Sequence, residues 1–195
     1  MLNKKGAMFG LDARIALAIF GALSVISGAA LYNAIQNVKS AQYWQTFKAI
    51  HDASEHYYLE NGKPLPIYSG VTLYGSDLVQ NRESLSTWNG PYLSNIENSN
   101  DYYFQIKDFP SEDSAIVLVT KSDSTLSNCS SASLNCAEYV RVNFSGDSLS
   151  LGKDMFSKLD NYIDNNDGAI NGKIRLIKVT DKDYLYVMGR QRTLP

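Results

Sequence analysis

The chain has 195 residues, 44% of them apolar and 19% charged, which suffices for one modest globular domain with an appendage. This composition argues against a chain that is disordered as a whole. The formal net charge of −2 offers no basic surface for nucleic acid, so no nucleic-acid partner is expected.

Residues 15–35 are the first distinctive element, because none of these positions carries a charge. As a helix the segment would be about 31 Å long, close to the thickness of a bilayer core. A cleaved secretory signal peptide has a shorter apolar core of about 7–15 residues, and a buried helix of a soluble domain seldom lacks charge for so long. The segment therefore predicts a single membrane span.

The cations near the start of the chain predict its orientation in the membrane. Lys4, Lys5 and Arg14 all precede the apolar segment. Under the positive-inside rule, the N-terminus stays in the cytoplasm and residues 36–195 are exported.

Residues 41–58 continue the helical pattern beyond the span. Apolar side chains recur every three or four positions and form one stripe, at Trp44, Phe47, Ile50, Ala53 and Tyr57. Gly62 and Pro64 then provide a helix stop. No proline interrupts residues 8–61, so we expect one long helix with its first half in lipid and its second half packed against a downstream domain.

The downstream domain, residues 62–195, is expected to contain a sheet. Residues 62–101 are interpreted as irregular with a helical turn at 77–80, and residues 154–164 as a short helix. Runs of β-branched and aromatic residues predict strands at 102–109, 115–121, 138–144, 173–180 and 184–189. This order predicts an α+β fold, in which the long N-terminal helix packs against a small antiparallel sheet.

Cys129 and Cys136 are the only cysteines of the chain. An even count in an exported domain favours a disulfide that closes a short loop, with two free thiols as the alternative. A zinc site would need further Cys or His ligands nearby, and the sequence has none there.

The N-terminal segment resembles that of type IV pilins and of the pseudopilins of type II secretion systems. In this family a short basic leader ends in glycine, a dedicated peptidase removes it, the new N-terminus is methylated, and the fifth mature residue is Glu. The resemblance rests on the apolar span and on the residues before it, Lys4-Lys5-Gly6-Ala7-Met8-Phe9-Gly10-Leu11-Asp12. With Asp12 in the place of that Glu, the resemblance implies a cleavage site between Ala7 and Met8, and N-methylation of Met8.

Three departures from the family pattern lie in this segment. Ala7 replaces the usual glycine before the cut, Asp12 replaces Glu, and Arg14 is an additional charge. A cut after Gly6 would restore the glycine but would make Asp12 the sixth mature residue. The cut after Ala7 keeps the acid in register and is the one we expect. A weaker resemblance lies in the segment Trp88-Asn89-Gly90-Pro91-Tyr92, which is similar to a W-x-G-P-Y loop of many family members.

The resemblance implies a leader at residues 1–7, a long helix at 8–61 and an exported head at 62–195. It implies a structural, non-enzymatic subunit of a type IV pilus or a type II secretion pseudopilus. The expected partners are prepilin peptidase, an inner-membrane assembly platform, membrane lipid and other pilin-like subunits in a helical filament. The expected location is the bacterial inner membrane, and after assembly a periplasmic or cell-surface filament.

A physical role for Asp12 follows from the implied cleavage. A new ammonium group at Met8 would lie at the lipid boundary, where a lone charge costs on the order of a few kcal/mol. Pairing it with Asp12 of a neighbouring subunit would offset that cost and assign Asp12 to assembly. The alternative is an acid that only caps the start of the helix. Arg14 is two residues further on and cannot face Asp12 along the helix.

Other readings of the sequence are weaker. A signal-anchored exported binding protein that does not polymerise is the alternative function. His51 with Glu55, and Asp52 with His56, have helical metal-ligand spacing, but the chain has only two histidines. Carboxylate and amide oxygens near residue 165 suggest a calcium site, and they belong to Asp160, Asp164, Asn166 and Asp167. Their spacing is not that of an EF-hand, and a tight turn at Gly168 is the alternative. We therefore expect no metal, no cofactor and no catalytic residue.

Overall fold

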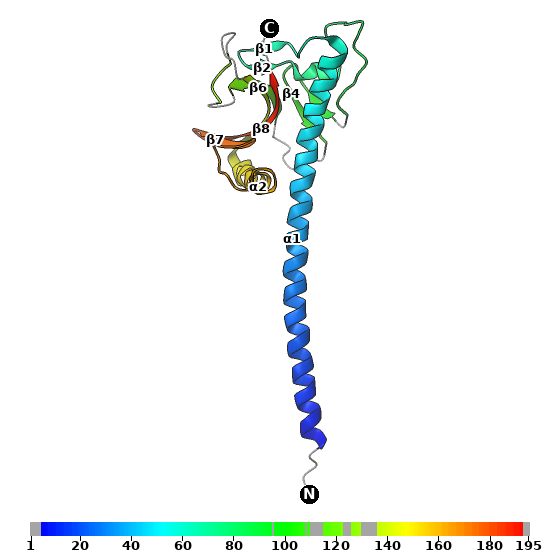
Figure 1. The fold of residues 1–195 in the computed structure, drawn as a ribbon, viewed down its shortest axis with the longest axis vertical. Helices are drawn as coiled ribbons and strands as arrows, with labels where there is room; N and C mark the ends of the chain where they lie inside the picture. The colour runs from blue at the N-terminus through cyan, green and yellow to red at the C-terminus, as the bar shows by residue number, and fades with distance from the viewer. Residues whose placement is uncertain are drawn as a thin grey trace. The chain divides into compact units, whose positions relative to one another are not determined.

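The computed structural model describes residues 5–94, 96–107, 109, 115–122, 126–129 and 136–192. Side chains are described from Gly10 onward, except those of residues 97–99. The chain divides into two compact units, Met1–Lys39 and Ser40–Pro195, which are considered separately below. Figure 1 shows the helices and strands in the colours of the chain order.

The first helix, α1 (Lys5–Asn61), confirms the expected long helix. It ends where the sequence predicts, because Gly62 takes the left-handed conformation with φ +65° and donates its N–H to the carbonyl of Tyr58 at 2.9 Å. By length and composition the helix can cross a membrane. Residues 5–39 of α1 belong to the first unit and residues 40–61 to the second.

The second unit contains an antiparallel sheet with the order β1-β2-β5-β6-β8-β7, and β4 pairs with both β3 and β5. This sheet and α1 confirm the α+β expectation. The eight strands are β1 (Ile67–Ser69), β2 (Thr72–Leu73), β3 (Ile96–Ser99), β4 (Tyr103–Ile106), β5 (Ile116–Ser122), β6 (Cys136–Ser145), β7 (Ile174–Val179) and β8 (Lys182–Arg192).

The expectation that residues 62–101 are irregular was wrong in part. This segment contains β1, β2 and β3 as well as a 3-10 turn, η1 (Gly75–Leu78). The three strands have two to four residues each, which is too short for an alternating pattern to be visible in the sequence. The predicted helical turn at 77–80 overlaps η1.

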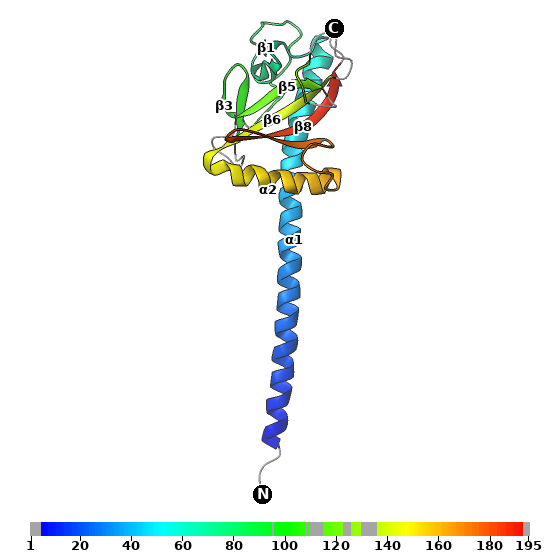
Figure 2. The same ribbon diagram turned by 90° about the vertical axis from the view of Figure 1, so that its left-hand side faces the viewer.

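The main core lies between one face of the sheet and two helices. The predicted stripe of α1 is confirmed, because Phe47, Ile50, Ala53 and Tyr57 are buried there and Trp44 packs at the edge. The second helix, α2 (Leu149–Leu159), buries Met155 and Leu159 in the same core. Figures 1 and 2 show α2 next to β7 and β8. The predicted helix at 154–164 therefore begins earlier and ends in a π-helical turn, η3 (Asp160–Asp164).

The opposite face of the sheet is also buried at its centre. Val117, Val119, Ala137, Tyr139 and Tyr186 form a second apolar cluster there. Because the central strands are buried on both faces, β5 has a continuous apolar sequence rather than an alternating one.

Candidate functional site

The residues of the implied processing site lie at the start of α1. Ala7 and Met8 belong to this helix, and their side chains are outside the described ones. Asp12 and Arg14 are exposed on the same helix. Cleavage after Ala7, methylation of Met8 and the role of Asp12 in assembly remain predictions.

The part of α1 that follows these residues is apolar on all sides. Leu17, Phe20 and Val25 point in different directions around the helix and expose 76%, 73% and 74% of their surface. The hydroxyl of Ser24 donates to the carbonyl of Phe20 at 2.8 Å, so this polar group is satisfied within the helix. A helix that is apolar all round requires lipid or other helices as its surroundings.

The segment that resembles a W-x-G-P-Y loop closes over the C-terminal end of α1. The indole N–H of Trp88 donates to the carbonyl of Asp77 at 2.9 Å. The hydroxyl of Tyr92 donates to a carboxylate oxygen of Glu60 at 2.7 Å, and the side-chain amide of Asn61 donates to the same hydroxyl at 3.3 Å. The aromatic ring of Tyr92 also packs edge-on against Tyr57. Within the second unit, the loop therefore fastens the last turn of α1 to η1.

His51, one of the metal-ligand candidates, is a packing residue between α1 and β8. Its Nε2 lies 3.2 Å from the carbonyl oxygen of Val187, which can only accept, so Nε2–H is the donor. Its Nδ1 is buried and has no hydrogen-bond partner among the described residues. Burial lowers the pKa of His51, and the charge of Glu138 and the Val187 carbonyl oppose this shift.

A bulge in β8 makes room for the His51 ring. Ala137 and Tyr139 of β6 pair with Gln191 and Met188, so two residues of β8, Gly189 and Arg190, stand opposite Glu138 alone. A Cβ atom on Gly189 would lie 2.0 Å from Nδ1 of His51. Among the described residues, no group of three or more metal-ligating side chains includes His51, and Asp52 pairs with Lys48 at 2.7 Å.

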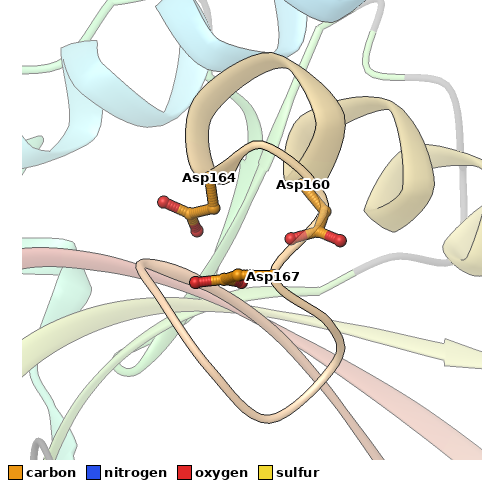
Figure 3. A group of neighbouring side chains, drawn as sticks. All are labelled: Asp160, Asp164 and Asp167. Carbon is orange, nitrogen blue, oxygen red and sulfur yellow. The ribbon is translucent and has the colours of Figure 1, made fainter.

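The structure does bring together three of the four residues considered for calcium. One carboxylate oxygen each from Asp160, Asp164 and Asp167 lie within 4.8 Å of one another, as Figure 3 illustrates. The side-chain amide of Asn166 instead donates to the side-chain oxygen of Asn161 at 3.0 Å. Within the described part of the chain, this is the one group of His, Cys, Asp and Glu side chains close enough to hold a metal ion.

Three ionised carboxylates at this distance repel one another when no cation lies between them. Burial raises the pKa of Asp160, and the neighbouring carboxyl groups of Asp167 and Asp164 raise it further. The backbone N–H of Gly168 opposes this shift. The sequence singled out these acids as calcium candidates but could not show that they meet, because the spacing of four and three residues is equally typical of an exposed helical surface.

Cys129 and Cys136 form a disulfide with a Cα–Cα distance of 6.0 Å. Cys136 is the first residue of β6 and is buried. The bond therefore ties Cys129 to the start of an interior strand of the sheet.

Comparisons of this chain with models of known protein families, with curated proteins and with solved structures find no match. The functional assignment therefore rests on the residues and the geometry of the chain itself.

Proposed function

We propose that this chain is a structural, non-enzymatic subunit of an envelope filament, either a type IV pilus or the pseudopilus of a type II secretion system. The observation that carries the proposal is the two-part character of α1. Its segment 15–35 is uncharged and exposed on all sides, whereas Phe47, Ile50 and Tyr57 further along are fully buried. An apolar helix that continues into a sheet domain is also what the resemblance to pilins implies, and it supports the same function.

The proposed route of the subunit begins in the bacterial inner membrane. The chain is inserted by its apolar helix with the second unit exported, in agreement with the cations that precede the span. Prepilin peptidase cuts between Ala7 and Met8 and the new N-terminus is methylated. The assembly platform then adds the subunit to a filament in which the apolar helices of many copies pack together.

In this proposal, Asp12 provides the contact that fixes the position of one subunit relative to the next. The ammonium group of Met8 and the carboxylate of Asp12 are both costly in apolar surroundings when alone. When Asp12 of an incoming subunit pairs with Met8 of its neighbour, each charge compensates the other and the two helices acquire a defined stagger. If only one partner is present, the other remains an uncompensated buried charge, which is strongly unfavourable.

The substitution Asp12→Ala tests this contact. We expect the variant to insert into the membrane and to be cut, but to be absent from filaments sheared from cells that lack the native copy. Asp12→Glu keeps the charge and is expected to assemble. Asp52→Ala is the matched control, because Asp52 is an exposed acid further along the same helix.

Two outcomes would contradict the proposal at different levels. Incorporation of Asp12→Ala at the level of the unmodified chain would remove the pairing role of Asp12. A parent chain that keeps its leader in the membrane and stays monomeric in detergent would favour a signal-anchored binding protein instead.

A further inference from the structure

The loop between α2 and β7 folds three carboxylates onto one position. Asp160 and Asp164 are the first and last residues of the π-helical turn η3. Asn165 and Asn166 follow with left-handed φ values of 56° and 59°, and they turn the chain back so that Asp167 lies beside the turn. Figure 3 shows the three carboxylates around one space, and one oxygen of each lies within 4.8 Å of the other two.

Asp160 provides an independent indication that this space holds a ligand. Only 4% of the residue is exposed, and its Oδ1 atom is buried without a hydrogen-bond partner among the described residues. Figure 3 shows this carboxylate on the side of the loop that faces Asp164 and Asp167. A buried carboxylate oxygen that lacks a donor is strongly unfavourable unless a cation or a proton satisfies it.

The backbone holds the carboxylate of Asp164 in place despite the repulsion of its acidic neighbours. Oδ2 of Asp164 accepts the backbone N–H groups of Lys173 and Ile174, each at 2.7 Å. Gly172 lies against the cluster, and a Cβ atom there would be 2.5 Å from Oδ2 of both Asp164 and Asp167. Glycine at this position therefore leaves the room that the two carboxylates occupy.

We propose that this loop binds one calcium ion through the carboxylates of Asp160, Asp164 and Asp167. Calcium–oxygen distances of about 2.3–2.6 Å allow ligand atoms on opposite sides of the ion to be about 4.6–5.2 Å apart, which accommodates the observed spacing. Magnesium, with distances of about 2.0–2.1 Å and a near-ideal octahedron, requires a closer and more regular set of oxygens than calcium does. Water and backbone carbonyls complete the six to eight oxygen ligands that calcium takes.

The calcium ion would fasten the end of α2 to the edge of the sheet. β7 is the outermost strand beside β8, and its first residue, Ile174, already donates to Asp164. The inference goes beyond the proposed filament function, and its test requires no filament. Failure of either one leaves the other unaffected.

The test uses the full-length chain in detergent micelles after treatment with a chelator. Isothermal titration with calcium chloride is expected to show one ion per chain, with a Kd of about 10⁻⁴–10⁻³ M, as in extracellular calcium modules. Asp160→Asn and Asp167→Asn are each expected to raise the Kd at least about tenfold. Asp181→Asn, an exposed acid in the β7–β8 turn, is the matched control and should bind like the parent.

Thermal unfolding in the same micelles distinguishes two roles of Asp160, a calcium ligand and a buried acid that binds no metal. With the chelator present, Asp160→Asn is expected to unfold at or above the parent temperature, because it removes a buried charge without changing the shape of the side chain. Calcium should raise the unfolding temperature of the parent and of Asp181→Asn but not that of Asp160→Asn. If Asp160→Asn does not fold, Asp167→Asn decides, because Asp167 is exposed.

Three results would overturn the proposal. They are the absence of saturable calcium binding to the parent, an unchanged Kd in Asp167→Asn, and binding of magnesium chloride at least as tight as that of calcium chloride.

Discussion

At the scale of single residues, the contact between α1 and the sheet depends on a few polar groups placed in an apolar interface. His51 and Glu138 are the main examples, and both have a buried polar atom without a hydrogen-bond partner among the described residues. Such groups are expensive to bury, so they make this interface sensitive to pH and to small changes in shape.

The pH dependence of stability should reflect His51. Its pKa is lowered in the folded state, mainly by burial, so the unfolded chain binds the proton more readily. The contribution of neutral, buried His51 to the free energy of unfolding is therefore fully present above the unfolded pKa of about 6.5. This contribution is lost as the pH falls through the folded pKa, and the free energy of unfolding decreases by no more than about 1.4 kcal/mol per pH unit. Urea unfolding of the full-length chain in micelles from pH 7.5 to 5 measures this slope.

The two histidines provide a matched pair for this measurement. His51→Asn should flatten the slope, whatever its effect on stability at pH 7.5. His56→Asn should leave the slope as it is, because His56 is exposed on the same helix. Equal slopes in the two variants would show that His51 does not titrate as its burial requires.

Gly189 should tolerate no side chain while His51 is present. In Gly189→Ala the new Cβ would lie 2.0 Å from Nδ1 of His51, whose ring is held by the Val187 carbonyl. Overpacking of this kind costs about 1–3 kcal/mol of unfolding free energy. The double variant His51→Ala with Gly189→Ala should be more stable than the sum of the two single changes predicts, and simple additivity would contradict the proposed clash.

At the scale of elements, the sequence predicted those that have a strong pattern. The stripe of α1 and the apolar runs of β5, β6 and β8 are long enough for their period and composition to be visible. The two-residue β2 and the bulge opposite Glu138 depend on pairing with distant strands, which no local pattern records. The acids of the loop were recognised as calcium candidates, but their meeting point could not be predicted, because it depends on the π-helical turn and on two left-handed asparagines.

The loop over the end of α1 should contribute measurably to stability. Tyr92→Phe removes a hydroxyl that bonds to Glu60, Asn61 and the backbone N–H of Asn89, and leaves the ring against Tyr57 and Trp88. We expect a loss of about 0.5–1.5 kcal/mol in unfolding free energy, with faster hydrogen exchange in the last turn of α1. Tyr162→Phe is the control, because Tyr162 is exposed, and an equal loss in both variants would contradict a specific role for the loop.

At the scale of the whole molecule, the chain combines two units with different requirements. The second unit buries its core between a sheet and two helices, while the segment 15–35 of α1 exposes apolar side chains on all sides. A soluble domain meets the first requirement but not the second, so the exposed apolar segment favours a protein whose helix is held first by a bilayer and then by copies of itself. In the proposed function, a charge pair between Asp12 and a new N-terminus at Met8 would link these two states.

The most direct test of this account is the intact mass and N-terminal sequence of the protein isolated from the membranes of its own cell. The account predicts a chain that lacks residues 1–7 and begins with Met8 carrying one added methyl group. A chain that begins at Ala7 would place the cut after Gly6 and would displace Asp12 from the fifth position. An intact Met1 on the membrane-bound protein would contradict the filament assignment.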